Sequence, residues 1–269
     1  MESMEGNAEG GAVAGIGSFV ALGDSFTEGI GDPRREGGYL GWADRFAEML
    51  ATQQPGLRYA NLAVRGKLLN EIAEEQVPRA VAMAPDLVSL AAGGNDILRP
   101  GADPDVLAEL FDSTVVSLRA AGCRVLVFTG SDPRIFPVIR LLRGKIATYN
   151  MHLRAIADSR GCDLVDLWSM RVLGDPRAWS ADRLHLNPEG HRRVALRACE
   201  VLGVPVADDW RLVAAVPARL AAGVPARLAA RRQDARWMRE YAMPWVGRRL
   251  RGASSGDDVL PKRPDLLPV

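Results

Sequence analysis

Short apolar runs alternate with longer amphipathic segments between residues 19 and 202, and this alternation predicts strands that are each followed by a helix. The runs that predict strands are 19–23, 57–64, 86–92, 123–129 and 162–167. Helical patterns occur at 39–51, 68–83, 103–121, 145–159 and 188–202. The strand segments are largely apolar, which is typical of strands buried on both faces. The pattern therefore predicts an α/β fold with a five-stranded parallel sheet and helices on both sides of it.

Small or polar residues come soon after three of the predicted strands. Ser25 follows the first strand, Gly66 the second and Asn95 the third. Because the carboxyl ends of parallel strands share one edge of a sheet, we expect these three residues to line one crevice. Ser25 taken alone has two interpretations, since a serine at such a place either caps the next helix or reacts with a ligand. A capping role alone would predict nothing about Gly66 and Asn95.

A serine nucleophile requires a base, and the histidines of the sequence are the candidates. His185 follows Asp182 by three residues in a loop. One turn of chain can therefore bring the carboxylate to Nδ1 and leave Nε2 free for Ser25. His152 lies within a predicted helix and is expected to be a surface or packing residue. His191 begins the last predicted helix and is expected to be structural.

Two alternatives exist for Asp182 and His185. They can form a salt bridge within the loop, or they can bind a metal ion together with His191 and Glu189. The metal site would leave the three residues at the strand ends without an explanation. The triad is therefore the preferred hypothesis.

Acyl transfer also requires hydrogen-bond donors aimed at the oxygen that becomes negative. The backbone N–H of Ser25 is one candidate. Gly66 is a second, because a residue without Cβ lets the backbone approach the substrate closely. The side-chain amide of Asn95 is the third. Glycine and asparagine are also ordinary turn residues, so each of them singly is a weak signal.

Four short motifs contain these residues, namely Gly23-Asp24-Ser25-Phe26, Asn61-Leu62-Ala63-Val64-Arg65-Gly66, Gly93-Gly94-Asn95-Asp96 and Asp182-Arg183-Leu184-His185. In order and spacing they resemble blocks I, II, III and V of the GDSL (SGNH) hydrolases, over about residues 18–202. By this resemblance Ser25 is the nucleophile, Gly66 and Asn95 complete the oxyanion hole, and Asp182 and His185 complete the triad. Phe26 replaces the leucine of the family name, which changes the packing beside the nucleophile.

The resemblance implies a flavodoxin-like, three-layer α/β/α sandwich, in agreement with the sheet predicted above. Known members of the family are esterases, lipases, thioesterases and carbohydrate deacetylases. We therefore expect a serine hydrolase that cleaves carboxylic esters with short to medium acyl chains. Its partner is a small-molecule ester, and the reaction requires neither a metal nor an organic cofactor. The loops that shape the acyl pocket cannot be deduced from the sequence.

Composition divides the chain into four expected parts. Residues 1–16 are expected to be a disordered lead-in, 17–203 the hydrolase domain, 204–251 a basic helical extension and 252–269 a flexible tail. The start of the chain lacks the basic and long apolar regions of a secretion signal, and the cysteines are odd in number. A cytoplasmic location with reduced thiols is therefore expected. The net charge of +1 argues against a nucleic-acid partner.

The expected helical extension is rich in alanine and arginine, and it contains the near repeat Val216-Pro217-Ala218-Arg219-Leu220-Ala221-Ala222 and Val224-Pro225-Ala226-Arg227-Leu228-Ala229-Ala230. The preferred interpretation is a set of short helices that pack their apolar stripe on the domain. A second interpretation, for residues 210–251, is a basic arm for an anionic membrane surface or an acidic partner. The alternative function that follows is a binding or scaffolding protein that acts through this arm.

Overall fold

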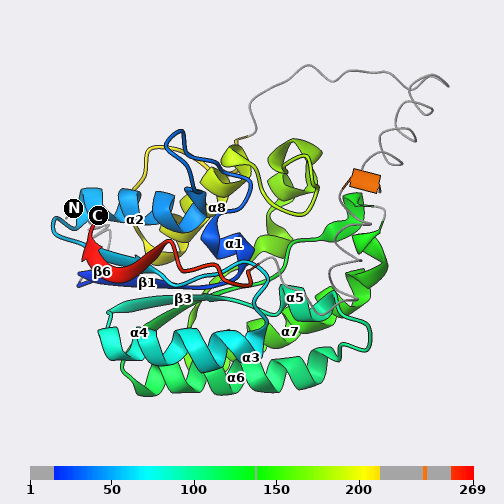
Figure 1. Cartoon of the computed structure of the whole chain (residues 1–269), viewed down its shortest axis with the longest axis horizontal. Helices are drawn as coiled ribbons and strands as arrows, with labels where there is room; N and C mark the ends of the chain where they lie inside the picture. The colour runs from blue at the N-terminus through cyan, green and yellow to red at the C-terminus, as the bar shows by residue number, and fades with distance from the viewer. Residues whose placement is uncertain (1–14, 137, 213–238, 241–255) are drawn as a thin grey trace, which may run out of the picture.

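The five predicted strands lie side by side in one parallel sheet, as a computed structural model describing residues 15–136, 138–212, 239–240 and 256–269 shows (Figure 1). They are β1 (Ser18–Gly23), β2 (Arg58–Asn61), β3 (Leu87–Ala91), β4 (Arg124–Phe128) and β5 (Asp163–Val165). The sheet order is β5-β4-β3-β1-β2-β6, where β6 is Arg263–Pro268. The prediction of a parallel α/β sheet is confirmed for these five strands.

The strand order reverses beside β1. The chain passes from β1 to β2 on one side, and then returns to place β3 on the other side of β1. Such a reversal opens a crevice at the carboxyl ends of the two strands, because the connections leave in opposite directions. The loops that follow β1 and β3 therefore meet where α/β proteins bind their ligands.

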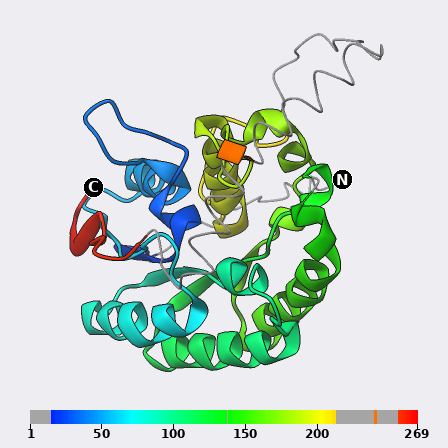
Figure 2. The same ribbon diagram turned by 45° about the vertical axis from the view of Figure 1, so that its right-hand side comes forward.

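Helices cover both faces of the sheet (Figures 1 and 2). On one face lie α1 (Ser25–Glu28), α2 (Gly41–Gln53) and α8 (Pro188–Leu202). On the other lie α3 (Leu69–Glu71), α4 (Val77–Met83), α6 (Pro104–Ala120) and α7 (Arg143–Arg160), and the short α5 (Gly94–Ile97) follows β3. Single turns at 133–135, 139–142, 167–169, 171–174 and 176–178 fill the long connections. The three-layer α/β/α sandwich is therefore confirmed.

Local signals explain why the last helix begins and ends where predicted. The side chain of Asn187 accepts a hydrogen bond from the N–H of Gly190, and Pro188 occupies the first turn. At the other end Gly203 adopts a φ of 72° and its N–H donates back to the last turn of α8. The predicted helix 188–202 coincides with the observed one for this reason.

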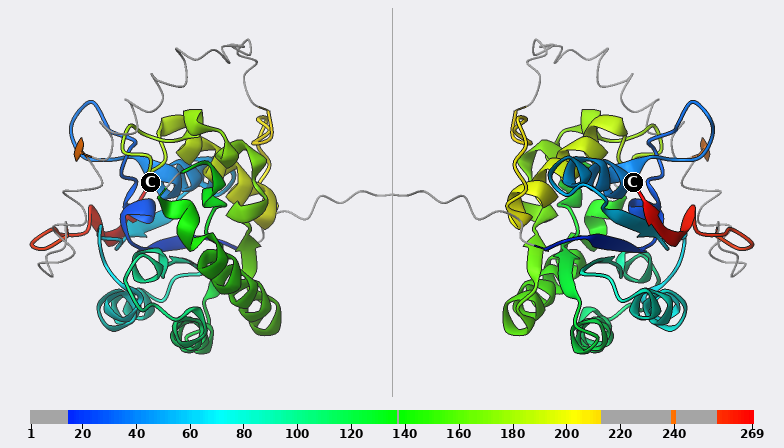
Figure 3. Two further views of the ribbon diagram at one scale, coloured as in Figure 1. Left: turned by 90° about the vertical axis from the view of Figure 1, so that its right-hand side faces the viewer. Right: turned by 90° about the vertical axis from the view of Figure 1, so that its left-hand side faces the viewer.

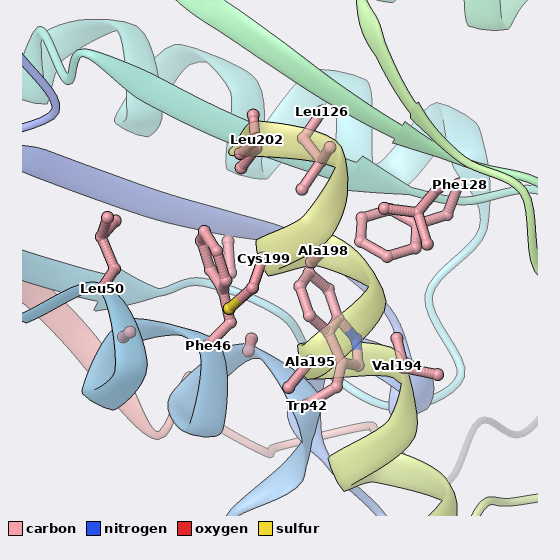
Figure 4. Packing of buried hydrophobic residues seen from close by; sticks show 14 of the residues in the cluster. Trp42, Phe46, Leu50, Leu126, Phe128, Val194, Ala195, Ala198, Cys199 and Leu202 are labelled. Atoms are coloured by element: carbon pink, nitrogen blue, oxygen red, sulfur yellow. The ribbon is translucent and has the colours of Figure 1, made fainter. Parts of the chain in front are cut away.

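Two apolar cores lie on opposite faces of the sheet. The first packs α2 and α8 against β1 and β4, with Trp42, Phe46, Phe128, Ala198 and Cys199 near its centre (Figure 4). The second lies under α6 and α7. Phe26, which replaces the leucine of the family name, packs at the rim of the first core with ring centroids 5.7 Å from Trp42. The substitution is thus accommodated by an aromatic cluster.

The C-terminal residues differ from the prediction of a flexible tail over 252–269. Residues 263–268 form β6, which pairs antiparallel with β2 and makes a sixth strand at the sheet edge (Figure 3). Pro264 and Pro268 lack backbone N–H groups, so the segment contains few of the signals of a strand. An edge position tolerates prolines, because one side of the strand has no neighbour to bond. The structure thus places a strand at 263–268, within the segment that was expected to be a flexible tail.

Other parts of the expected organisation lie outside the described residues. They are residues 1–14 of the expected lead-in and residues 213–238 and 241–251 of the expected basic extension. Residues 204–212 continue from α8, where the indole N–H of Trp210 donates to Glu200 at 2.6 Å. No helix in the described part of the chain is long and apolar enough to cross a bilayer.

His191 is fully buried and joins three elements. Its Nδ1 accepts a hydrogen bond from the N–H of Trp42 at 3.1 Å, and its Nε2 lies 3.1 Å from the carbonyl oxygen of Ile30, to which it donates. Burial lowers the pKa of His191 to about 4, because the charged imidazolium would lose its hydration. The imidazole is therefore neutral at pH 7, which suits the structural role expected from the sequence.

The buried imidazole predicts that stability falls in mild acid. Above pH 6.5 His191 is neutral in both the folded and the unfolded protein. Between pH 6.5 and 4 the imidazole is protonated in the unfolded chain but stays neutral in the folded protein, which favours unfolding. The free energy of unfolding should lose roughly 3 kcal/mol over this window from this residue. Urea titrations at several pH values should show a shallower pH dependence in His191→Gln than in the wild type. Equal slopes would contradict the assignment.

Candidate active site

Ser25 is the first residue of α1, directly beyond the end of β1. The residue that caps this helix is Asp24, whose Oδ1 accepts a hydrogen bond from the N–H of Phe26 at 3.0 Å. The capping interpretation of Ser25 is therefore wrong. The neighbouring carboxylate performs that role, and the Ser25 hydroxyl is left to interact elsewhere.

The Ser25 hydroxyl meets His185. Ser25 Oγ lies 2.9 Å from His185 Nε2, and His185 Nδ1 lies 2.6 Å from Asp182 Oδ2. With the proton on Nδ1, the imidazole donates to the carboxylate and accepts from the serine hydroxyl. The three side chains form one continuous hydrogen-bonded chain in the geometry of a nucleophile, its base and the acid that orients the base.

The Asp182 carboxylate is held by its own turn. Its Oδ1 accepts hydrogen bonds from the N–H groups of Leu184 and His185, both at 3.0 Å, and from the hydroxyl of Ser180 at 2.6 Å. Burial raises the pKa of Asp182, but the hydrogen bonds and charge of His185 and the bond from Ser180 outweigh it and hold this pKa well below its ordinary value. Asp182 is thus charged at pH 7 and stabilises an imidazolium at His185.

The loop that carries His185 is held against the loop after α1. A Cβ at Gly31 would lie 2.0 Å from the carbonyl oxygen of Leu186, so only glycine permits the two backbones to approach this closely. His191, at the start of α8, is bonded to Ile30 one residue earlier, as described above. Because α8 packs in the core, these contacts fix the position of His185 relative to Ser25.

Gly66 follows β2 in a turn where its φ is 80°. The preceding residue, Arg65, is fixed by the buried carboxylate of Glu28 in α1. Glu28 accepts from the backbone N–H of Arg65 at 2.7 Å and from its Nε at 3.0 Å. These bonds connect the loop after β2 to the helix that carries Ser25.

Among the described residues, the backbone N–H groups of Ser25 and Gly66 donate to no acceptor.

Asn95 lies in α5, at the end of β3. Its Nδ2 donates to Asp24 Oδ2 at 3.0 Å and to the carbonyl oxygen of Lys67 at 3.1 Å. The amide thus connects the loops that follow β1, β2 and β3. Both hydrogens of Nδ2 are directed at protein acceptors, so donation to a substrate oxygen requires a three-centre bond or an exchange of partner.

Gln76 holds the end of β1 from the opposite face of the sheet. Its side chain accepts from the N–H of Gly23 and donates to the carbonyl of Gly23, both at 2.9 Å. Gln76 ends a π-helical segment, 72–76, that interrupts the single helix predicted over 68–83. Pro78 follows, and its missing N–H is one reason why regular α-helical bonding fails here.

An apolar cavity of about 230 Å³ opens beside Ser25 and His185. It lies between the ends of β3 and β4 and the side of α7 that faces them. Its apolar lining includes Ile97, Phe128, Phe136, Ile146, Leu153 and Trp179. Ser25, Asn95 and His185 also line this cavity, together with other polar residues such as Thr129 and Asn150. The site therefore combines a reactive hydroxyl with a hydrophobic chamber.

The sequence reasoning missed four residues that support the site, namely Asp24, Glu28, Gln76 and Ser180. Asp24 and Ser180 each bond to a residue two positions away, to Phe26 and Asp182, so these two carry a local signal. Glu28 and Gln76 bond to residues 37 and 53 positions away, so no spacing in the sequence could reveal them. The residues that were predicted all lie at the carboxyl ends of the strands or in the loop before α8.

His191 and His152 both have hydrogen-bond partners within the protein. Both ring nitrogens of His191 bond to backbone groups, which leaves no lone pair for a metal. Over the described ranges, no group of three His, Cys, Asp or Glu side chains has the arrangement of a metal site. His152 lies on the surface, 2.7 Å from Asp105, as expected. The three cysteines are free thiols.

Comparison with solved structures shows the same fold. LAE5, an alpha/beta hydrolase from the metagenome of Lake Arreo in Spain, is 22% identical and covers 72% of this chain and 99% of its own, with a TM-score of 0.62. The acetylxylan esterase Axe2 from Geobacillus stearothermophilus is 18% identical and covers 76% and 100%, with a TM-score of 0.58. TesA is 23% identical and covers 69% and 97%, also at 0.58.

Sequence comparison identifies the family. No curated protein resembles the chain closely enough in sequence to count as a match. The family model of the GDSL-like lipases and acylhydrolases, however, matches residues 21–193, which is more than half of the chain. This range contains Ser25, Gly66, Asn95, Asp182 and His185. The chain therefore belongs to the GDSL-like lipase/acylhydrolase family and is a carboxylic ester hydrolase.

Proposed function

We propose that the chain hydrolyses carboxylic esters through a covalent acyl-enzyme on Ser25. The observation that carries this proposal is the hydrogen-bonded chain from Ser25 Oγ through His185 to Asp182, with distances of 2.9 and 2.6 Å. A hydroxyl in this position can transfer its proton to Nε2 as it attacks a carbonyl carbon. The charged Asp182 stabilises the imidazolium that this transfer creates.

Acylation and deacylation use the same base. His185 takes the proton of Ser25 as the oxygen bonds to the acyl carbon, and it then gives this proton to the departing alcohol. A water molecule next loses a proton to His185 and attacks the acyl-enzyme. The bond from the acyl carbon to Ser25 Oγ then breaks, and His185 returns the proton to Oγ as the acid leaves. Each step moves one proton through Nε2, so the tautomer fixed by Asp182 is required throughout.

The negative oxygen of each tetrahedral intermediate is assigned to the N–H groups of Ser25 and Gly66 and to the amide of Asn95. The absence of protein acceptors for the first two groups among the described residues supports this assignment. Asn95 takes part by sharing a hydrogen that now bonds to Asp24 or to the Lys67 carbonyl. Asn95 therefore has a second task, which is to hold the loop after β2 in place.

The acyl group is assigned to the apolar cavity beside Ser25, and its length to the medium range. An acetyl group would bury little of a chamber of about 230 Å³. Each additional methylene buried there contributes about 0.8 kcal/mol of transfer free energy. Axe2, which has the same fold, is named for acetylated xylan. Acetyl esters of carbohydrates are therefore the competing substrate class.

Replacing the nucleophile tests the reaction itself. Ser25→Ala should lower kcat on a p-nitrophenyl ester by several orders of magnitude, because the remaining groups cannot form an acyl-enzyme. The unfolding midpoint should change little. A fluorophosphonate probe should label the wild type on Ser25 and leave the variant unlabelled. Full activity in the variant, or an unlabelled wild type, would refute the proposal, and the latter result would favour a binding role.

Removing the amide of Asn95 tests the oxyanion hole. Asn95→Ala should reduce kcat by about 10²–10³, which is the usual effect of losing one such donor. KM should change much less, since the charge develops only in the transition state. Kinetics on the folded variant, with its unfolding midpoint measured in parallel, provide the check. Activity near that of the wild type would remove Asn95 from the hole.

A series of p-nitrophenyl esters tests the acyl pocket. From acetyl toward octanoyl, kcat/KM should rise about fourfold per methylene until the chain fills the cavity. Ile146→Phe narrows the cavity and should lower kcat/KM for octanoyl while leaving acetyl nearly unchanged. Met151→Phe is the matched control, because Met151 lies on the same helix and is 68% exposed. A preference for acetyl that Ile146→Phe does not alter would assign the natural substrate to acetyl esters.

A further inference from the structure

The peptide group that joins Arg65 to Gly66 is in contact with the C-terminal part of the chain. Gly256 is buried, and a Cβ placed on it would lie 1.9 Å from the carbonyl oxygen of Arg65 and 3.0 Å from a methyl group of Val64. The carbonyl of Arg65 and the N–H of Gly66 belong to one rigid plane. Contact at this oxygen therefore constrains the direction of the Gly66 N–H.

Glycine is required at position 256 for space and not for an unusual backbone conformation. Its φ lies outside the left-handed region that favours glycine. The φ of this residue therefore does not exclude alanine. The main obstacle to a side chain is the Arg65 carbonyl, with the Val64 methyl group next, so a Cβ at position 256 would push the two segments apart.

Residues 256–269, which we call the C-terminal strap, are anchored to the domain beyond Gly256. Lys262 Nζ donates to the carbonyl oxygens of Leu40 at 2.7 Å and Tyr39 at 3.2 Å, and lies 2.9 Å from Asp44. Arg263 Nε donates to the carbonyl of Tyr59 at 2.8 Å, at the start of β6. In Figure 1 the strap, in red, runs from β6 along the sheet edge toward α1.

The strap and the loop after β2 also share a neighbour. The guanidinium of Arg65 lies 5.2 Å from the centre of the Tyr39 ring, and the backbone of Tyr39 accepts from Lys262. The other side of Arg65 bonds to Glu28. The Arg65–Gly66 peptide is thus enclosed between α1, which carries Ser25, and the strap.

We propose that the C-terminal strap positions the Arg65–Gly66 peptide so that the Gly66 N–H points at the oxyanion, with Gly256 as the positioning residue. This inference rests on the proposed role of Gly66 in the oxyanion hole. The strap then does more than cover the edge of the sheet. It adds to the site a contact from outside the four family motifs, since none of them includes a residue after 202.

A strap that only stabilises the fold and a strap that also positions the Arg65–Gly66 peptide predict different results for stability and for kcat. Loss of edge pairing alone would lower the unfolding midpoint and leave kcat per folded site as it was. A shift of the Arg65–Gly66 peptide would weaken binding of tetrahedral species and leave ground-state binding nearly intact. The decisive quantities are therefore kcat per active site, KM and the affinity for a tetrahedral adduct.

The test compares Gly256→Ala with the wild type in the full-length protein. Active sites are counted by titration with a fluorophosphonate, and kinetics use a p-nitrophenyl ester. We expect kcat per site to fall about tenfold to a hundredfold, since displacements near 1 Å have effects of this size, while KM changes less than twofold. The inhibition constant of a trifluoromethyl ketone, which forms a tetrahedral adduct with the serine, should rise by a similar factor.

Two further variants make the result decisive. Gly144→Ala is the matched control, because a Cβ there meets no atom within 4 Å, and it should retain the wild-type kcat. Lys262→Gln loosens the strap without adding a clash, and it should lower kcat several-fold at constant KM. If Gly256→Ala did not fold, Lys262→Gln alone would decide. Wild-type kcat and ketone affinity in the folded strap variants would overturn this inference, whereas an inactive wild type would overturn the proposed function instead.

Discussion

The hydrogen bond of 2.9 Å between Ser25 and His185 joins two loops that are 160 residues apart in the sequence. No local preference can produce such a bond, since both loops must be placed to within about half an ångström. One loop is fixed by β1 and by the clasp of Gln76 on Gly23. The other is fixed by α8, which packs on α2 in the first core. The three-layer arrangement is the condition for the site to exist.

Sequence patterns predicted the elements that depend on local composition and on burial. The five parallel strands and the helix 188–202 were found because apolar runs and caps act within a few residues. Parallel strands end at one edge of a sheet, and for this reason the sequence predicted that Ser25, Gly66 and Asn95 line one crevice. The pair Asp182 and His185 was found because its geometry is contained in one turn.

Most of the remaining features could not be predicted, since they depend on partners distant in the sequence. The cap of α1 is an exception, because Asp24 bonds to Phe26 nearby, but Asp24 and Ser25 are both residue types that cap helices and only the structure distinguishes them. The π-helical segment before Pro78 serves to direct Gln76 at Gly23, a residue 53 positions away. The sequence pattern did not predict β6, because its segment contains two prolines and a strand accepts prolines only at a sheet edge.

The position of β6 beside β2 bears on the boundaries of the domain. Residues 213–255 connect two anchored points, the end of α8 with Trp210 on one side and Gly256 on the other. The domain therefore includes residues on both sides of this segment, so a truncation after α8 would remove β6 as well. Removal of β6 would expose the outer edge of β2, and an exposed edge strand is open to pairing with another chain.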